Sequence, residues 1–316
     1  MEITPNLLLE HSAIHASQST SPSKSLLLTC RVSIKDLPTS ICLFKNNNFL
    51  FSLPENHRER IVSKYYPESG DLITTSSNSG LSVIDINKEE IIYSYDDFIN
   101  DHLYVESERS EVPRIVGITD SSLKFFDLRS RQSIFSVHFP GLKGIKELNI
   151  EGKISLYFYT ADSIYIFDKN DPFKLSSKFM PQKIVEIGKS ISLHSNNSKI
   201  GIKGKIITDI GAYRGEICYI YQDGSNKYLA TQTETFDAVH DHMSTKSNGD
   251  LWLYSKNEIA SFSRDVTEKI RLNISESNKI QNKNKKKKRE SQIRDVFPLF
   301  GRSIISTFEN TYIVDE

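Results

Sequence analysis

A five-residue phrase, apolar-x-apolar-apolar-Asp, recurs three times in this 316-residue chain at almost constant spacing. It occurs as Leu81–Asp85, Leu123–Asp127 and Ile164–Asp168, and successive aspartates are 42 and 41 residues apart. Apolar residues in alternation are typical of a β-strand that buries part of its surface. A strand phrase that returns about every 40–45 residues predicts an all-β chain built from repeated units of that length.

The residues around each phrase predict the other strands of the repeated unit. Upstream of Leu81–Asp85, two strands are expected, with turns at Pro67–Gly70 and Asn78–Gly80, because Gly and Asn tolerate positive φ. Downstream, Ile91–Tyr95 is expected to be an outer strand. A four-stranded unit of this length is typical of a β-propeller blade. We therefore predict a single all-β propeller over residues 1–316.

Further strand pairs fill most of the chain, and seven blades are the expected number, with six or eight as alternatives. The final hairpin, Ser303–Phe308 with Thr311–Asp315, has no outer strand of its own. We expect Leu7–Ile14 to supply that strand, because closure by the other terminus removes two free sheet edges. The other expected pairs are Ser40–Phe44 with Asn48–Leu53, Pro113–Thr119 with Leu123–Leu128, Ile154–Tyr159 with Ile164–Phe167, Ser190–Ser195 with Lys199–Lys203, Ile217–Gln222 with Lys227–Gln232, and Gly249–Tyr254 with Glu258–Ser263.

The three phrases resemble the third strand of the WD-repeat family, which typically ends in Trp-Asp followed by an apolar residue. Ile84, Phe126 and Phe167 stand at the Trp position, and Phe126–Arg129 is the nearest match. The Gly-His pair that usually opens a WD-repeat is missing from these three units. The resemblance covers residues 40–170 and 249–316. It implies a rigid disc whose loops bind other proteins.

Composition is consistent with such a fold in an intracellular protein. Hydrophobic residues make up 38% of the chain, with 17 Phe and 14 Tyr. No uncharged apolar stretch approaches the roughly 18–20 residues that a membrane helix needs, and the N-terminal sequence has no pattern of a secretory signal. Cys30, Cys42 and Cys218 are too few and too scattered for a disulfide framework or a zinc site. We expect them to be small buried residues of apolar strands.

Positive charge is concentrated in residues 273–295, which we expect to form a disordered basic insert between the last two blades. A short Lys/Arg run of this kind is typical of a nuclear import signal or of a weak electrostatic contact to nucleic acid. No aromatic residues are interleaved, so base stacking is not expected. The expected location is the nucleus, with the nucleolus included and the cytoplasm as the alternative. A chance lysine run in a Lys- and Asn-rich chain is the competing interpretation. The candidate contact residues are Lys283, Lys285, Lys286, Lys287, Lys288 and Arg289.

One tight cluster of metal-type ligands is present, His240-Asp241-His242, with Asp237 and His194 as further candidates. On a strand, His240 and His242 would face the same side, as two zinc ligands require. Spacing places no third ligand, so a polar loop between blades is the expected interpretation. The sequence has no phosphate-binding loop and no nucleophile elbow. We therefore expect no catalytic residue, no metal and no cofactor.

The function expected from these features is a non-catalytic scaffold in a nuclear or nucleolar multiprotein complex for ribosome assembly, chromatin or RNA processing. Its partners would be other proteins of that complex, without contact to a membrane. Asp127 and Arg129 also resemble the Asp-x-Arg box by which some propellers dock to a cullin-ligase adaptor. A substrate receptor of such a ligase is therefore one alternative. A hydrolase or metal-dependent enzyme built around His240 and His242 is the other.

Overall fold

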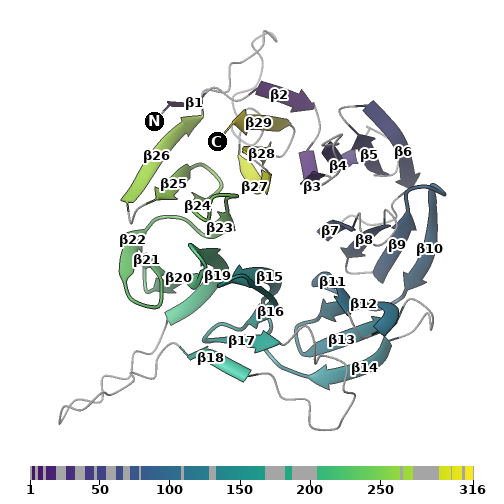
Figure 1. Cartoon of the computed structure of the whole chain (residues 1–316), viewed down its shortest axis with the longest axis horizontal. Coiled ribbons are helices and arrows are strands. Elements are labelled where there is room, and N and C mark those ends of the chain that lie inside the picture. The colour runs from purple at the N-terminus through teal and green to yellow at the C-terminus, as the bar shows by residue number, and fades with distance from the viewer. Residues whose placement is uncertain are drawn as a thin grey trace. The chain divides into compact units, whose positions relative to one another are not determined.

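The computed structural model describes most of the chain, and all regular structure in the described residues is β-strand (Figure 1). No helix in this part of the chain is long and apolar enough to cross a membrane. The described residues are 2–3, 6–9, 12–18, 26–32, 40–45, 48–54, 62–66, 72–77, 80–107, 110–127, 133–167, 182–186, 205–263, 266–272, 292–299, 301–307 and 310–315.

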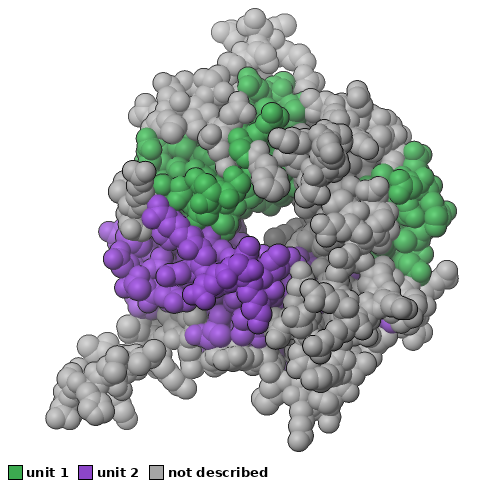
Figure 2. Space-filling view, viewed as in Figure 1, with its two compact units in different colours: residues 1–99, 244–316 green, residues 100–243 purple. Residues whose placement is uncertain are grey.

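Within these residues the strands form seven sheets, six of four strands and one of five. The chain divides into two compact units, residues 1–99 with 244–316 and residues 100–243 (Figure 2). The second unit contains three sheets, each made of four consecutive strands. They are β11 (Asp101–Ser107), β12 (Ser110–Ile118), β13 (Ser122–Asp127) and β14 (Ser133–His138); β15 (Gly144–Ile150), β16 (Lys153–Tyr159), β17 (Ser163–Phe167) and β18 (Gln182–Glu186); and β19 (Lys205–Tyr213), β20 (Glu216–Asp223), β21 (Asn226–Ala230) and β22 (Thr235–Ala238).

The first unit follows the same plan with two additions from the N-terminus. Its first two sheets are β3 (Ser12–Gln18), β4 (Leu26–Val32), β5 (Ser40–Lys45) and β6 (Asn48–Pro54), then β7 (Val62–Tyr66), β8 (Leu72–Ser77), β9 (Gly80–Asp85) and β10 (Glu90–Tyr95). The third holds β24 (Leu251–Tyr254), β25 (Ile259–Ser263), β26 (Val266–Leu272) and β1 (Glu2–Ile3), and β23 (His242–Thr245), which crosses the unit boundary, is its edge strand. The fourth holds β27 (Ile293–Leu299), β28 (Arg302–Thr307), β29 (Thr311–Asp315) and β2 (Asn6–Leu9).

The recurring phrase forms the third strand of its sheet, as predicted. β9 and β13 show the same order of buried and half-buried residues along their length. Their three apolar positions are all buried, although neighbouring residues of a strand point to opposite faces. The phrase therefore belongs to strands that are covered on both faces.

Strand β16 shows how both faces of one sheet become buried. Leu156 and Phe158 pack into an apolar cluster with residues of β11, β12 and β13. The alternate residues Tyr157 and Tyr159 pack into a second cluster with residues of β19 and β20. The sheet β15–β18 is thus sandwiched between the sheets that precede and follow it in sequence. In the first unit, Trp252 of β24 and Val296 of β27 belong to a corresponding cluster between two consecutive sheets.

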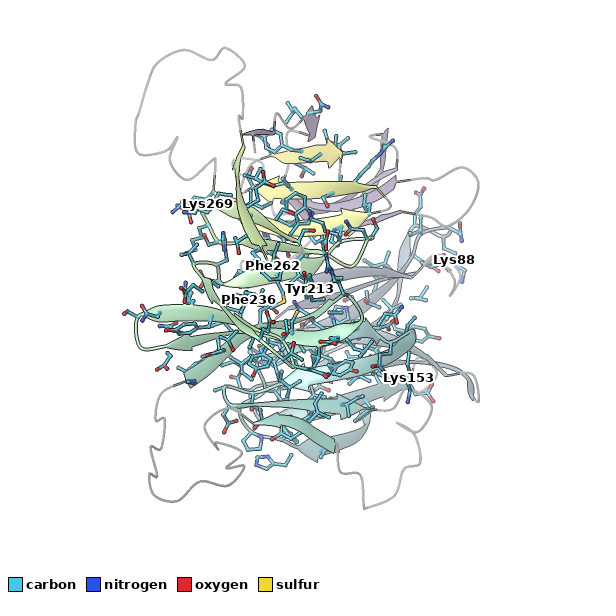
Figure 3. All side chains as sticks on the ribbon, turned by 60° about the vertical axis from the view of Figure 1, so that its left-hand side comes forward. Lys88, Lys153, Tyr213, Phe236, Phe262 and Lys269 are labelled. Carbon is cyan, nitrogen blue, oxygen red and sulfur yellow. The ribbon has the colours of Figure 1, made fainter. Side chains whose placement is uncertain are left out.

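Short threonine turns connect several of the adjacent strands. The N–H groups of Ser122, Ser163 and Asn310 donate to the hydroxyl oxygen of the threonine three residues earlier, at 2.9, 3.1 and 3.0 Å. A hydroxyl that accepts from the turn backbone fixes the turn without glycine. Among the labelled side chains of Figure 3, Phe262 is fully buried, whereas Lys88 and Lys269 extend into solvent.

The N-terminal strands join sheets made from the end of the chain. β1 pairs in parallel with β26, and β2 pairs antiparallel with β29, with Leu7 opposite Tyr312. The expected pairing of an N-terminal strand with the final hairpin is confirmed for Leu7–Leu9, and the strand begins one residue earlier, at Asn6. The expected extension to Ile14 is wrong, because residues 12–14 belong to β3 and pair with β4.

Other sequence predictions have mixed outcomes. The hairpins at β5–β6, β20–β21, β24–β25 and β28–β29 are confirmed. The turn Pro67–Gly70, the strands expected over residues 190–203, Asp168 and most of the basic insert lie outside the described residues. The first strands of the three sheets in the second unit, β11, β15 and β19, were not predicted from the sequence.

Candidate functional site

A buried carboxylate in the middle of β19, that of Asp209, is the centre of a polar network. The register with β20 shifts between Ile207 and Asp209, so Thr208 is an extra residue on this strand. Such a bulge re-aims the side chains that follow it. Just before the bulge, the N–H of Ile207 donates to the carbonyl oxygen of Ala161 in the preceding sheet, at 2.7 Å. This contact positions the strand from which Asp209 projects.

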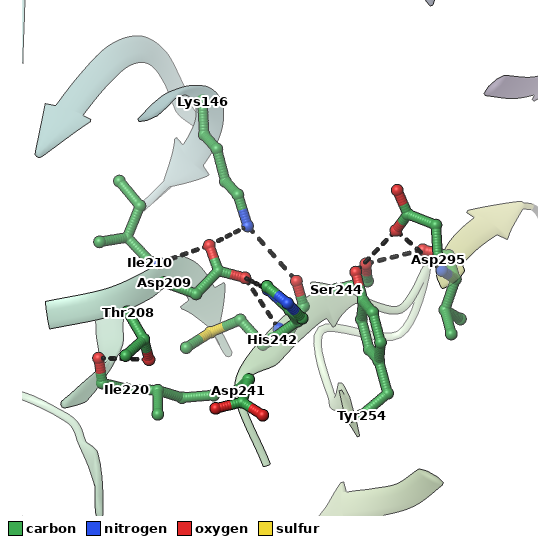
Figure 4. Close-up of polar contacts among 12 residues, drawn as sticks. Lys146, Thr208, Asp209, Ile210, Ile220, Asp241, His242, Ser244, Tyr254 and Asp295 are labelled. Atoms are coloured by element: carbon green, nitrogen blue, oxygen red, sulfur yellow. Dashed lines mark hydrogen bonds and ion pairs between the residues drawn. The ribbon is translucent and has the colours of Figure 1, made fainter. Parts of the chain in front are cut away.

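Asp209 is only 4% exposed and accepts hydrogen bonds from three donors (Figure 4). The Nζ of Lys146 on β15 lies 2.6 Å from Oδ1, and the N–H of Ile210 donates to the same oxygen at 2.8 Å. The N–H of Met243 on β23 donates to Oδ2 at 2.9 Å. The carboxylate therefore joins β15, β19 and β23. We call Lys146, Asp209, His242 and the main chain of Met243 the Asp209 cluster.

The chemistry of the Asp209 cluster is that of a structural junction. A buried carboxylate is costly unless it is paired and hydrogen-bonded, and here three donors meet that requirement. The Nζ of Lys146 also donates to the carbonyl oxygen of Met243 at 3.4 Å. His242 lies at the rim, with its Nδ1 4.0 Å from Asp209 Oδ2 and its side chain 55% exposed. All three donors belong to the protein's own strands, so the carboxylate links those strands to one another.

The same local pattern recurs in the first unit at Ile293–Val296. The register of β27 with β28 shifts between Ile293 and Asp295, and the N–H of Val296 donates to Asp295 Oδ1 at 2.9 Å. The N–H of Ile293 donates to the carbonyl oxygen of Lys256 in the preceding sheet at 2.8 Å. Here the hydroxyl of Tyr254 replaces a lysine and donates to Asp295 Oδ1 at 2.6 Å (Figure 4). The shared signal, Ile-x-Asp-Ile/Val at 207–210 and 293–296, is visible in the sequence and was missed.

A sulfur-lined contact adjoins the Asp209 cluster. Gly211 lies opposite Cys218 in the β19–β20 register, and the Cys218 thiol lies 3.5 Å from the Met243 sulfur. A Cβ atom added at Gly211 would lie 2.5 Å from that sulfur. Burial raises the pKa of the Cys218 thiol; the positive charge of Lys146 lowers this pKa and the negative charge of Asp209 raises it, and burial has the largest effect. Cys218 is therefore a buried neutral thiol, as the sequence predicted.

The candidate metal ligands His240 and His242 do not lie on one strand. His240 is buried, whereas His242 and Asp237 are exposed, and β23 begins only at His242. His240 and Asp241 lie between β22 and β23, in keeping with the expected loop. Within the described residues, no three His, Cys, Asp or Glu side chains are grouped so that they could hold a metal ion. His194 lies outside the described residues.

Two other groups of predicted site residues are covered only in part. Asp127 is the last residue of β13 and pairs in register with Arg114 of β12. Arg129, its partner in the adaptor-docking hypothesis, lies outside the described residues, as do Lys283, Lys285, Lys286, Lys287, Lys288 and Arg289. Both assignments stay predictions.

Comparison with known proteins adds no relative: no protein-family model matches the chain, and no curated protein matches it.

Proposed function

We propose that the seven sheets are the blades of a single β-propeller of the WD-repeat type, and that the chain is a non-catalytic scaffold for other proteins. The observation that carries the proposal is the pairing of β2 with β29, because it completes a four-stranded sheet from both ends of the chain. Closure of this kind is how a propeller protects its sheet edges. The face-to-face packing of consecutive sheets within each unit supports the same architecture.

The Asp209 cluster supports a scaffold over an enzyme. Its buried carboxylate accepts from three donors of the protein itself, and Asp295 repeats the arrangement with a tyrosine hydroxyl. Polar groups that recur in this way on the first strand of a sheet stabilise the fold by connecting strands. The loops that connect the strands would then bind the partner proteins, because a rigid framework holds such loops in place.

The basic run within residues 283–289 supports a nuclear or nucleolar site of action. A dense Lys/Arg segment suits import recognition or a weak contact to nucleic acid phosphates. Ribosome assembly, chromatin and RNA processing all use propeller scaffolds, so the proposed partners are proteins of one such complex.

Affinity purification of the tagged chain from its own cells, followed by mass spectrometry, tests this function. A reproducible set of nuclear or nucleolar proteins is the expected result. In a variant with neutral residues at Lys285–Arg289, we expect nuclear accumulation to fall while the melting temperature stays unchanged. Recovery of a cullin-ligase adaptor that is lost in Arg129→Ala would favour the substrate-receptor alternative. Recovery of no partner at all would contradict the scaffold.

A further inference from the structure

Two of the three cysteines face each other across the two central strands of the first sheet. Cys30 of β4 and Cys42 of β5 are register partners in an antiparallel pair, flanked by the regular pairs Thr29–Leu43 and Arg31–Ile41. The strand order β3-β4-β5-β6 places both residues inside the sheet and away from its edges. The sequence separation of these cysteines had suggested no connection between them.

Their register position meets the backbone requirement of a disulfide. Directly opposed residues of an antiparallel pair have Cα atoms about 4.5 or 5.5 Å apart, depending on the type of pair. Disulfides span Cα separations of about 4.4–6.8 Å. Both pair types fall within that range, so the backbone would not have to move for a bond to form.

The row of residues that contains the two cysteines is made of small residues across the entire sheet. Cys30 pairs with Ala13 of β3 on one side, and Cys42 pairs with Ser52 of β6 on the other. Directly opposed residues share one face of a sheet. No bulky residue of this sheet therefore occupies the row in which the two cysteines stand.

We propose that Cys30 and Cys42 form a dithiol site that a small disulfide such as oxidised glutathione converts to a cross-strand disulfide. The thiolate of one cysteine attacks a glutathione sulfur, which forms a mixed disulfide and releases one glutathione thiolate. The second cysteine thiolate then attacks the protein sulfur of that mixed disulfide and releases the second glutathione. The two cysteine protons pass to the two released thiolates. Two protein thiols are oxidised, and one glutathione disulfide is reduced to two thiols.

Cys218 provides an internal control in the same chain. It lies in the second unit, is fully buried and has a pKa raised by burial. Its register partner is Gly211, so no second cysteine stands opposite it, and Cys218 is expected to stay outside the link between Cys30 and Cys42.

The test is to incubate the folded full-length protein with oxidised glutathione, block free thiols, and digest with trypsin without reduction. Cleavage after Lys and Arg yields one peptide of residues 25–31 with Cys30 and another of residues 36–45 with Cys42. We expect these two peptides to be joined, with a mass two hydrogens below their sum, and the Cys218 peptide to carry the blocking group only after unfolding. A Cys218→Ala variant should form the same joined species.

Single variants show whether the second step depends on the pairing. In Cys30→Ser, the glutathione adduct should accumulate on Cys42, and in Cys42→Ser it should accumulate on Cys30, because the resolving thiol is absent. The wild-type result is decisive by itself if a variant fails to fold. Separate glutathione adducts on both cysteines, a link to Cys218, or two free thiols under strongly oxidising conditions would each overturn the proposal.

Discussion

The Asp209–Lys146 pair allows a quantitative test of how the second unit is held together. At 2.6 Å, the attraction between the two charges is roughly 6 kcal/mol for an effective dielectric constant of about 20. Much of that energy offsets the cost of taking both charges out of water. Removal of one partner of a fully buried pair costs about 3–5 kcal/mol. The Lys146 side chain is 33% exposed, so water replaces part of its contribution.

We therefore expect Lys146→Met to lower the free energy of unfolding by about 2–3 kcal/mol, because Asp209 keeps only its two backbone donors. Asp209→Asn keeps the shape and removes the charge, and should cost about 1–3 kcal/mol. The double variant should cost less than the sum of the two, with a coupling energy of about 1–2 kcal/mol. Urea unfolding followed by circular dichroism provides the free energies, provided that the slope with denaturant stays constant.

The pair Lys227–Asp241 is the matched control, since both of its side chains are more accessible than that of Asp209. Lys227→Met should cost less than about 1 kcal/mol, because its carboxylate partner Asp241 is 41% exposed and water can replace the lysine. The reasoning is refuted if Lys146→Met and Lys227→Met destabilise equally, or if the Asp209 and Lys146 substitutions are additive.

Three further predictions concern buried groups. Gly211→Ala should lower the free energy of unfolding by about 1–3 kcal/mol, because the added methyl group crowds the Met243 sulfur. Adding Met243→Ala to that variant should restore part of this free energy in a denaturant titration, and full additivity of the two substitutions would contradict the contact. Ser303→Ala removes the oxygen that accepts the hydrogen bond from the indole N–H of Trp252 at 2.7 Å. We expect the free energy of unfolding to fall by about 1–3 kcal/mol and the tryptophan emission to shift, whereas unchanged emission would count against this hydrogen bond. Burial raises the pKa of Tyr219, so the neutral Tyr219 side chain stabilises the fold fully below the unfolded pKa of about 10, and this stabilisation is lost as the pH rises through the folded pKa. The ultraviolet titration of Tyr219→Phe should lack a late tyrosinate step, and loss of an early step instead would refute the assignment.

The strands that were predictable from sequence are those whose apolar pattern is complete within the strand itself. Leu81, Val83 and Ile84 are all apolar because the sheet is covered on both faces, and the pattern shows this without knowledge of any partner. Strand β15 was missed because Lys146 and Glu147 interrupt its apolar residues. The lysine is tolerated there because its amino group meets Asp209 from another sheet. Lys146 and Asp209 are far apart in the sequence, so no pattern of neighbouring residues indicates their contact.

The Asp209 cluster was missed for a related reason. A charged residue after Ile207 and Thr208 suggests a turn when the sequence is considered alone. Its three donors come from its own neighbour, from β15 and from β23, so only the folded chain brings them together. The repetition of Ile-x-Asp-Ile/Val at two sites was the available signal, and its meaning depends on a bulge that periodicity does not reveal. The pairing of Cys30 with Cys42 likewise depends on strand register.

The pairing of β1 and β2 with β26 and β29 has a consequence for synthesis on the ribosome. β1 and β2 complete sheets whose partner strands, β26 and β29, are made about 270 and about 305 residues after them. At about 5–20 residues per second, β2 has no partner strand for roughly 15–60 s. During that time its backbone N–H and C=O groups are open to pairing with other chains. β2 therefore stays open to chaperones and to aggregation until β29 has emerged from the ribosome.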